Sequence, residues 1–260
     1  MAAADLERAS RAHAGLARSL GFGRSLAIYF GQPWRTRALH RHYRPFLGPG
    51  DLAFDVGAHV GNHARCFARL GARVVAIEPQ PAFAAWLRWL FRNQPRITVV
   101  ESALAAAPGT ALLYRSPRTP TVATVSRQWI AAAGASAGFE RVRWTEGIEV
   151  AATTLDALIA RHGAPRFCKI DVEGYEAEVL RGLSRPIPVV SFEYLPAAIE
   201  VAADAAAALA ALGPYRFNLT VGEHRRFLWP AWRPRAELEA WLRARQPDEP
   251  SGDVYARLEA

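Results

Sequence analysis

Short apolar runs alternate with helical patterns along most of this chain. The run Leu52–Val56 leads through a glycine turn into a helical pattern over Gly61–Leu70. Continuous apolar runs are typical of parallel strands whose two faces are both covered by helices. The alternation therefore predicts βαβ units and an α/β domain built on a parallel sheet. The further strands expected are Arg73–Ile77, Ile97–Val100, Ile148–Thr153, Phe167–Asp171 and Val189–Glu193, and the further helices are Pro79–Phe91, a segment ending at His162, Tyr175–Leu183 and Ala197–Leu212.

The N-terminal part of the chain has a different pattern. Ala3–Leu20 is helical in its spacing of apolar residues, and a second helical segment opens at Pro33 and runs to about Leu47. The sequence Gly-Pro-Gly at 48–50 ends that segment. We therefore expect an N-terminal helical extension over residues 1–50 and one main domain over residues 51–260.

Two later stretches interrupt the alternation. Residues 105–147 are rich in Pro, Gly, Thr, Ser and Ala, with a candidate strand at Ala111–Tyr114. An irregular stretch of this length inside a compact domain is either a functional lid or a surface insertion, and the sequence leaves both open. After the last helix, Tyr215–Thr220 and Phe227–Trp229 are expected to pair as an antiparallel hairpin around Gly222.

Composition and charge argue against several classes of protein. Of the 260 residues 51% are hydrophobic, yet no apolar run reaches the length of a membrane span or a secretory signal, so we expect a cytoplasmic protein without a transmembrane segment. Two cysteines are too few for a disulfide scaffold or a cysteine-rich zinc site. The formal net charge is +8, but the basic residues are spread along the whole chain, which disfavours nucleic acid as a partner.

The segment FDVGAHVGNH at 54–63 joins the first expected strand to the helix that follows it. In an open parallel sheet, ligands bind outside the carboxyl ends of the strands, and a glycine turn there lets a ligand approach the backbone N–H groups of a helix. We therefore expect a ligand above Gly57. The second strand ends at Glu78, where a carboxylate can accept hydrogen bonds from both hydroxyls of a ribose.

The spacing of the glycines separates the nucleoside cofactors that use such a turn. Nicotinamide dinucleotides favour GxGxxG, but here His59 stands at the middle glycine position and the spacing is Gly57 to Gly61. A phosphate-binding GxxxxGK[ST] loop is absent from the sequence. S-adenosylmethionine has no phosphate, and it needs room beside the turn, an acid for the ribose, and anionic or dipolar groups around its sulfonium. Asp55, Gly57, Gly61 and Glu78 supply that set.

A second constellation, FCKIDVEGYE at 167–176, ends the fourth parallel strand. Asp171 and Glu173 lie two residues apart, so in an extended segment they face the same side, and Gly174 permits a sharp turn into the next helix. Glu193 ends the neighbouring strand. Each acid alone is explained by the dipole of a following helix, but carboxylates at one strand tip are costly to desolvate unless they hold a cation or a proton in transit. Their coincidence at adjacent strand ends indicates a site.

These motifs carry a family resemblance. In order and spacing, DVGAHVG, AIEPQP, TTLDALI and KIDVEGYEAEVLRG resemble the FkbM-type S-adenosylmethionine-dependent methyltransferases, over about Leu52 to Glu193. The resemblance implies a Rossmann-like class I methyltransferase fold, in which a mostly parallel sheet of seven strands, the last one antiparallel, has helices on both faces. It also implies S-adenosylmethionine as the cofactor and methyl transfer to a hydroxyl of a sugar, a glycan or a secondary metabolite.

By position, the resemblance also assigns residues to the cofactor. Asp55 and the two glycines of the turn would line its methionine part, Glu78 its ribose, and Asp171 the junction with the acceptor. Family members commonly have Asn where this chain has His59. The full set expected to bind the cofactor is Asp55, Gly57, His59, Gly61, Asn62, Glu78, Glu101, Ser102 and Asp171, of which Glu101 and Ser102 would lie beside adenine.

The chemistry of a sulfonium methyl group limits what the protein must supply. Because the methyl group is already activated, the protein must mainly align an acceptor oxygen with it and remove a proton from a weakly acidic hydroxyl. Candidate bases are Asp171, Glu173, Glu193 and His224, with Glu173 the first choice, and Lys169, the only lysine, is a candidate electrostatic helper. We expect no metal site, because the paired histidines near the glycine turn have no neighbouring carboxylate or cysteine to complete a ligand set.

Two alternatives to a methyltransferase stay open from the sequence. One is a nicotinamide-dependent oxidoreductase, which the same architecture permits but which the missing GxGxxG and Tyr-x-x-x-Lys patterns disfavour. The other is an Arg-rich module that binds nucleic acid or another anionic surface. The sequence defines neither the acceptor, which we expect to be a small molecule or a glycan, nor the oligomeric state.

Overall fold

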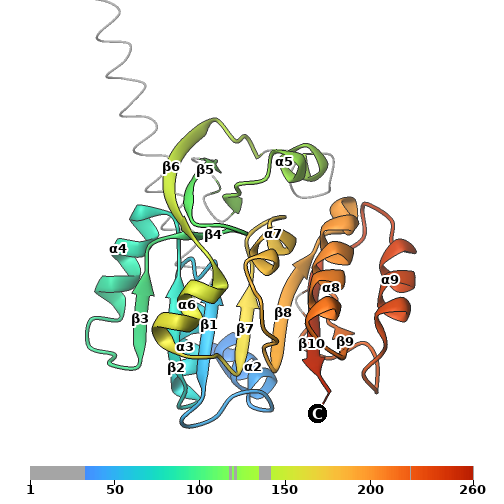
Figure 1. Cartoon of the computed structure of the whole chain (residues 1–260), viewed down its shortest axis with the longest axis horizontal. Coiled ribbons are helices and arrows are strands. Elements are labelled where there is room, and N and C mark those ends of the chain that lie inside the picture. The colour runs from blue at the N-terminus through green and yellow to red at the C-terminus, as the bar shows by residue number, and fades with distance from the viewer. Residues whose placement is uncertain (1–32, 117–118, 120–121, 135–141, 223, 260) are drawn as a thin grey trace, which may run out of the picture.

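A seven-stranded sheet forms the centre of the protein. The structure is a computed structural model that describes residues 33–116, 119, 122–134, 142–222 and 224–259. The strands of this sheet follow the order β3-β2-β1-β7-β8-β10-β9 (Figure 1). In chain order they are β1 (Leu52–Val56), β2 (Arg73–Ile77), β3 (Ile97–Val100), β7 (Phe167–Ile170), β8 (Val189–Tyr194), β9 (Tyr215–Leu219) and β10 (Gly252–Leu258).

Most of these strands are parallel, as the sequence predicts. β1 pairs in parallel with β2 and β7, β2 with β3, and β7 with β8, whereas β10 lies antiparallel between β8 and β9. The expected α/β class, with its mostly parallel sheet and antiparallel last strand, is therefore confirmed. The chain winds outward from β1 to β3 and then returns to the other side of β1 with β7. In such sheets ligands bind at the carboxyl ends of the strands beside this reversal.

Helices cover both faces of the sheet. Alternate residues along a strand point to opposite faces, so Phe54 and Ile170 join one apolar layer while Ala53 and Phe167 join the other. Within the described residues, none of the helices has the length and apolarity needed to span a membrane. One face packs against α2 (Pro33–Tyr43), α3 (Asn62–Arg69) and α4 (Pro81–Leu90), and the other against α6 (Leu155–His162), α7 (Glu176–Arg181), α8 (Ile199–Leu212) and α9 (Arg235–Arg243).

The N-terminal part of the chain is described only from residue 33. The helix expected at Ala3–Leu20 lies outside the described residues, and the boundary expected after residue 50 stays a prediction. α2 begins at Pro33 as expected but ends at Tyr43 instead of running to Leu47. The reason is a turn in which the N–H groups of Phe46 and Leu47 both donate to the Tyr43 carbonyl and which buries both side chains against the sheet.

A separate three-stranded sheet stands above the carboxyl ends of the central strands (Figure 1). The expectation of an irregular stretch over 105–147 was therefore wrong in part, and Ile148–Thr153 pairs in this sheet instead of the central one. A short apolar run does not identify its partner strand, because partner choice depends on packing that the local pattern does not contain. The order of the small sheet is β4-β6-β5, and its strands are β4 (Ala103–Leu104), β5 (Gly109–Arg115) and β6 (Glu146–Thr153). The helix α5 (Arg127–Ala133) lies between β5 and β6 in the chain.

The C-terminal pairing differs from the expected hairpin. β9 is present, but its partner is β10 and not Phe227–Trp229, and neither β10 nor α9 was expected. One backbone hydrogen bond, from the N–H of Leu228 to the carbonyl of Leu219 at 2.8 Å, ties that segment to β9. The side chain of Asn218, which bonds the N–H and the carbonyl of Trp229, completes the link in place of a strand ladder. β10 fits between β8 and β9 because Gly252 lets two backbones meet: a Cβ there would lie 2.1 Å from the carbonyl oxygen of Thr220.

One row of polar residues crosses the sheet face under α2 and α3. Asp55, Lys169, Ser191 and Tyr255 are register partners on the adjacent strands β1, β7, β8 and β10, and all four are buried. Their side chains share a face because residues in register point the same way. Burying polar groups costs free energy unless they are paired, so a buried polar row of this kind indicates that a functional site lies beside it. Two residues further toward the carboxyl edge, the same face carries the acids Asp171, Glu193 and Asp253.

The turn between β1 and α3 presses β1 against the end of β7. Gly57 has a φ of 79°, and its N–H donates to the carbonyl of Ile77 at 3.0 Å. A Cβ at Gly57 would lie 1.8 Å from the carbonyl oxygen of Asp171. Gly61 has a φ of 87°, and a Cβ there would lie 2.7 Å from the side chain of Leu87. Both the backbone conformation and the space therefore require glycine at these positions.

Gly57→Ala tests the close approach at this turn, and Gly50→Ala is the matched control. Gly50 also has a φ of 87°, but open space lies where its Cβ would be. We expect Gly50→Ala to lower the free energy of unfolding by about 1 kcal/mol, the cost of a left-handed alanine. Gly57→Ala should cost about 1–3 kcal/mol more, because two backbones must also move apart. Urea unfolding followed by circular dichroism measures both, and equal losses would contradict the close approach.

Candidate active site

Two hollows meet at the carboxyl ends of β1, β7 and β8. A narrow cleft of about 50 Å³ lies between the β1–α3 turn, the end of β2 and the three-stranded sheet. A larger cavity of about 500 Å³ lies among α2, α3, the residues after β9 and the residues before β10. Asp171 and Glu173 line both hollows. A molecule in the cleft would therefore lie next to a molecule in the cavity.

The cleft combines a buried acid with apolar walls. Glu78 is 3% exposed, and its carboxylate accepts hydrogen bonds from the backbone N–H groups of His59 and Gln80, both at 2.9 Å. Burial raises the pKa of Glu78 to about 7, although the two hydrogen bonds act to lower it. An apolar slot beside a carboxylate suits a nucleoside, because the base can fill the slot while the sugar donates hydrogen bonds. The apolar residues of the slot include Ile77, Leu104 and Leu113.

Several of the expected cofactor residues come together in this cleft. His59 has a φ of 48°, and its ring centroid lies 4.3 Å from that of Phe83. Burial lowers the pKa of His59 to about 4, so its ring is neutral at pH 7. The Ser102 hydroxyl shares its one proton between the backbone carbonyls of Ala103 and Ala151, at 2.9 and 3.0 Å, which fastens the cleft to the three-stranded sheet. The expected residues that line the cleft are Gly57, His59, Glu78, Ser102 and Asp171.

The structure places the other expected cofactor residues outside the cleft. Asn62 begins α3 and lines the larger cavity. Gly61 packs against α4, as described above. Glu101 is turned toward the surface, where its carboxylate bonds the Arg88 guanidinium at 2.7 Å. Asp55 is buried below the glycine turn. Contacts of these four residues with a cofactor stay predictions.

Asp55 and Lys169 form a buried charged layer beneath the site. Burial raises the pKa of Asp55 to about 6, against the opposing effects of the Lys169 charge and of a hydrogen bond from the Ala64 backbone. Lys169 is 2% exposed, and its ammonium group donates to the Asp171 carboxylate at 2.5 Å. Burial acts to lower the pKa of Lys169, but the surrounding acids, Asp171 first, raise it overall. The lysine therefore keeps its charge and fixes Asp171 at the junction of the two hollows.

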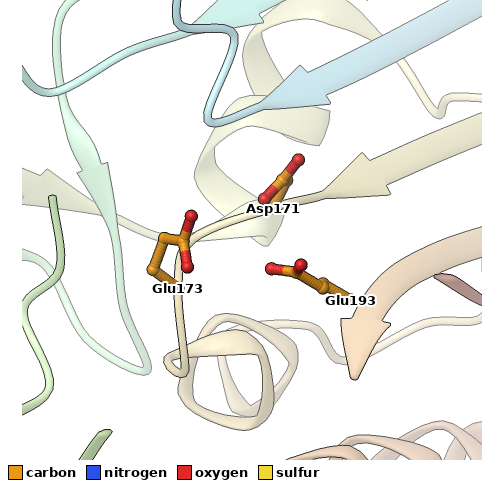
Figure 2. Close-up of side chains that lie close together, drawn as sticks. All are labelled: Asp171, Glu173 and Glu193. Carbon is orange, nitrogen blue, oxygen red and sulfur yellow. The ribbon is translucent and has the colours of Figure 1, made fainter. Parts of the chain in front are cut away.

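Three carboxylates converge where the cleft opens into the cavity. Figure 2 shows the side chains of Glu173 and Glu193 turned toward one another, with Asp171 beside them at the end of β7. Ligand oxygens of the three lie within 4.8 Å of one another. Burial, and then the neighbouring acids, raise the pKa of both Glu173 and Glu193 well above the ordinary value for glutamate. The two therefore titrate as a pair that holds a proton at a pH where a lone glutamate is ionised.

Glu173 reaches this cluster by a route that the sequence did not predict. We expected an extended segment, but β7 ends before Asp171 and Glu173 has a φ of 55°, which makes the segment a turn. The Glu176 carboxylate accepts hydrogen bonds from two backbone N–H groups of this turn, at 3.2 and 3.3 Å. The expected reason for the proximity of the acids was wrong, whereas the structure does bring all three together.

Polar side chains predominate in the larger cavity. On α2, a ring nitrogen of His42 bonds the Tyr255 hydroxyl at 2.8 Å, and the other bonds the backbone carbonyl of Arg225 at 3.1 Å. Burial lowers the pKa of His42 to about 4, so this ring is neutral. Arg225 and the exposed His224 line the cavity after β9, and no described carboxylate forms an ion pair with the Arg225 guanidinium. The cavity thus offers a cationic group as well as the acid cluster.

The arrangement suits a nucleoside cofactor in the cleft and a polar acceptor in the cavity. The cleft is smaller than the roughly 300–1,000 Å³ of typical ligand pockets, so its walls must part to admit an adenosyl group. The acid cluster has two chemical capacities. It can accept a proton from a hydroxyl group, and its three carboxylates are close enough to hold one cation, a ligand set that the sequence analysis did not anticipate.

Sequence reasoning missed several residues that line the two hollows. Gln80 follows the expected ribose acid by two positions and could have been placed from that proximity. Thr124 lies in a stretch without a recognisable motif, and Asp253 lies in a strand that was not expected, so neither carries a local signal. The missed residues that matter most are Gln80, Thr124, Arg225 and Asp253.

Comparisons with known proteins extend over both parts of this site. Residues 55–231 match the model of the Methyltransferase FkbM domain family. The hexuronic acid methyltransferase AglP of Haloferax volcanii is 28% identical over 144 residues, which make up 55% of this chain and 54% of that protein. The chain thus aligns with about half the length of that curated relative.

Two solved structures are more remote. An O-methyltransferase from Bacillus cereus, solved in complex with SAH, is 13% identical with a TM-score of 0.49, over 92% of this chain and 90% of that one. The fibrillarin of Aeropyrum pernix, solved with natively bound S-adenosyl-L-methionine, is 12% identical with a TM-score of 0.41, over 80% of this chain and 67% of that one.

The family match runs from the glycine turn through the acid cluster and past the end of β8. It covers more than half of the chain and extends beyond Glu193, where the motif resemblance ended. The resemblance indicated by the sequence motifs is therefore confirmed. This chain belongs to the family of proteins that contain a methyltransferase FkbM domain.

Proposed function

We propose that this protein transfers a methyl group from S-adenosylmethionine to a hydroxyl group of a sugar. The observation that carries the proposal is the meeting of the two hollows, since a cleft suited to a nucleoside adjoins a proton-accepting acid cluster at Asp171 and Glu173. Membership of a methyltransferase family and the named activity of the relative support the same chemistry. The oxidoreductase and nucleic-acid alternatives have no comparable support.

The cleft is proposed to bind the adenosyl part of the cofactor. Each oxygen of the Glu78 carboxylate accepts one backbone hydrogen bond and keeps further acceptor capacity for ribose hydroxyls. The base would fill the apolar slot beside it. The methionyl end would extend past Asp171 toward Asn62, where the cleft opens into the cavity. When bound, S-adenosylmethionine supplies a methyl group that is activated by its sulfonium charge.

The acid cluster is proposed to remove the proton of the acceptor hydroxyl. As the acceptor oxygen bonds the methyl carbon and the carbon–sulfur bond breaks, the hydroxyl proton must pass to a base. Ionised Glu173 takes this proton, and Glu193 beside it shares it. Asp171, held by Lys169, would place its carboxyl group next to the sulfonium of a bound cofactor. Because the pair must first lose its own proton, the rate should rise with pH above the range in which an ordinary glutamate ionises.

The acceptor is proposed to be a sugar that carries a carboxylate. The relative is named for a hexuronic acid, and this cavity is lined by Arg225, a guanidinium without an ion-pair partner among the described residues. A guanidinium can bind a carboxylate through two parallel hydrogen bonds. The acids across the junction then have hydroxyl groups of the sugar within reach. A volume of about 500 Å³ is in the range of sites that hold small molecules.

Glu78→Gln tests the ribose contact, with Glu101→Gln as the matched control. We expect Glu78→Gln to weaken the binding of S-adenosylhomocysteine by about 10- to 100-fold, because a charge-assisted hydrogen bond is lost. Glu101→Gln alters an acid that pairs with Arg88 at the surface and should bind as the wild type does. Isothermal titration calorimetry measures the affinities.

The same titration carries a pH dependence. Because the pKa of Glu78 is about 7, wild-type affinity should fall as the pH drops below 7, since a protonated carboxyl accepts hydrogen bonds less well. Unchanged affinity in Glu78→Gln would refute the ribose assignment.

Glu173→Gln tests the base, with Glu178→Gln on α7 as the control. We expect Glu173→Gln to lower kcat by about 100-fold or more, the usual effect of losing a general base, while affinity for S-adenosylhomocysteine stays close to that of the wild type. Glu178 bonds Arg181 away from the cluster, so its variant should keep full activity.

The assay follows label from methyl-labelled S-adenosylmethionine into 4-nitrophenyl β-D-glucuronide, with the matching glucoside for comparison. The proposal expects the glucuronide to be methylated faster. Full activity in Glu173→Gln would exclude this base, and label in neither sugar, with cofactor bound, would contradict the proposed acceptor class.

A further inference from the structure

The strained turn that carries the proposed base is held in place by contacts with residues next to the three-stranded sheet and with the helix α5. Glu173 has a φ of 55°, a left-handed conformation that residues other than glycine adopt at a cost unless their surroundings hold them there. The hydroxyl of Thr124 donates to the backbone carbonyl of Glu173 at 2.6 Å. Thr124 is 1% exposed, so no water competes for this hydrogen bond.

A second contact comes from the same short segment. The indole of Trp129, in the first turn of α5, lies against Gly174, where a Cβ would be 2.1 Å from Cδ1 of the ring. The hydroxyl of Thr124 also accepts a hydrogen bond from the N–H of Ser126 at 2.9 Å, and the Ser126 hydroxyl accepts one from the N–H of Trp129 at 3.1 Å. The two contacts with the turn are therefore joined by hydrogen bonds into one unit.

That unit is anchored to the three-stranded sheet. Thr124 pairs with Tyr114 of β5 through two backbone hydrogen bonds, at 2.8 and 3.0 Å. On the other side, the Trp144 ring nitrogen donates to the carbonyl of Val122 at 2.8 Å. The position of the Glu173 backbone is thus set from outside the central sheet, by residues that lie about fifty positions earlier in the chain.

We infer that Thr124 is a positioning residue, whose hydroxyl holds the Glu173 backbone in its left-handed conformation and so keeps the Glu173 carboxylate against Glu193. This inference rests on the proposed function in one respect, since it gives the held carboxylate its role as base. The three-stranded sheet then has two roles. It places the base, and it forms a wall of the cleft through Thr124 and its neighbours. Without the hydroxyl, the turn relaxes and the two carboxylates separate.

The charged groups around Glu173 define what such a separation changes. Lys169 approaches Glu173 from β7, and Asp171 approaches it from the position directly after β7. Glu176 approaches Glu173 from α7. Glu193 on β8 faces it and is itself influenced by Asp253 of β10. The segment 122–126 contains no titratable side chain. Movement of Glu173 away from Glu193 therefore leaves both carboxyl groups with fewer neighbouring negative charges, which lets each ionise at lower pH.

Thr124→Val is the direct test, because valine has nearly the same shape but no hydroxyl. Thr124→Ser keeps the hydroxyl and is the rescue variant. Thr154→Val is the control for general destabilisation, since the Thr154 hydroxyl caps α6 by accepting from the N–H of Ala157 at 3.1 Å, away from the site. Should Thr124→Val fail to fold, Thr124→Ala removes the same hydroxyl with a smaller side chain.

The first measurement is a carboxyl titration by NMR on protein labelled with ¹³C at glutamate, which needs no ligand. In the wild type and in Thr124→Ser, the Glu173 signal, which Glu173→Gln removes, and the Glu193 signal, which the same variant shifts, should both titrate well above the ordinary range. In Thr124→Val they should shift back toward it, whereas Thr154→Val should lower Tm by a few degrees and leave them in place.

The second measurement is methyl transfer to 4-nitrophenyl β-D-glucuronide. Thr124→Val should lower kcat about tenfold, with affinity for S-adenosylhomocysteine little changed, and Thr124→Ser should recover most of the loss. Wild-type titration in Thr124→Val, or equal defects in the valine and serine variants, would overturn the role of the hydroxyl. Failure of the wild type to bind S-adenosylmethionine would instead overturn the proposed function and leave the titration as the test of Thr124.

Discussion

The contact between Gly57 and the backbone carbonyl of Asp171 is the constraint on which the rest of the site depends. It presses the turn after β1 against the end of β7 with no room for a side chain. As a result, the cleft beside the turn and the cavity beside the acids share one wall, made by Asp171 and Glu173. Molecules bound in the two hollows would therefore lie next to one another, which is the geometry that the transfer of a group between them requires.

Buried charge is the second feature on which the site depends. The polar row from Asp55 to Tyr255 places a charged lysine under the site, and that lysine bonds Asp171 at 2.5 Å. Beside Asp171, Glu173 and Glu193 are held in a partly buried place where a further negative charge is disfavoured. Their raised pKa follows from this arrangement. A positive sulfonium beside them would oppose this effect, because it favours their ionised forms.

Local patterns predicted the central sheet well and the additions to it poorly. The strands Leu52–Val56 and Arg73–Ile77 could be located because buried parallel strands are continuous apolar runs between turn residues. Ile148–Thr153 has the same appearance but pairs elsewhere, since partner choice is decided by packing over long distances in the chain. β10 escaped notice because its place depends on Gly252 meeting Thr220, a contact without a trace in the local sequence.

The candidate site shows the same division. Glu78, Asp171 and Glu193 could be predicted because each lies at the carboxyl end of a recognisable strand, and acids at the carboxyl ends of neighbouring parallel strands must lie close together. Glu101 also follows a strand, yet it pairs with Arg88 at the surface, because position along a strand does not fix the direction of the side chain after the strand ends. Thr124 acts through a hydrogen bond that spans 49 positions of sequence, which local reasoning could not have supplied.

The central claim is that the sulfonium of the cofactor lies beside a pair of acids that share a proton. Calorimetric titration in buffers of different ionisation enthalpy measures the protons released on binding, and S-adenosylmethionine and S-adenosylhomocysteine differ in the charge at sulfur. The account predicts that at pH 7 S-adenosylmethionine releases more protons than S-adenosylhomocysteine, by up to about one per site. Equal proton release by the two ligands would contradict it.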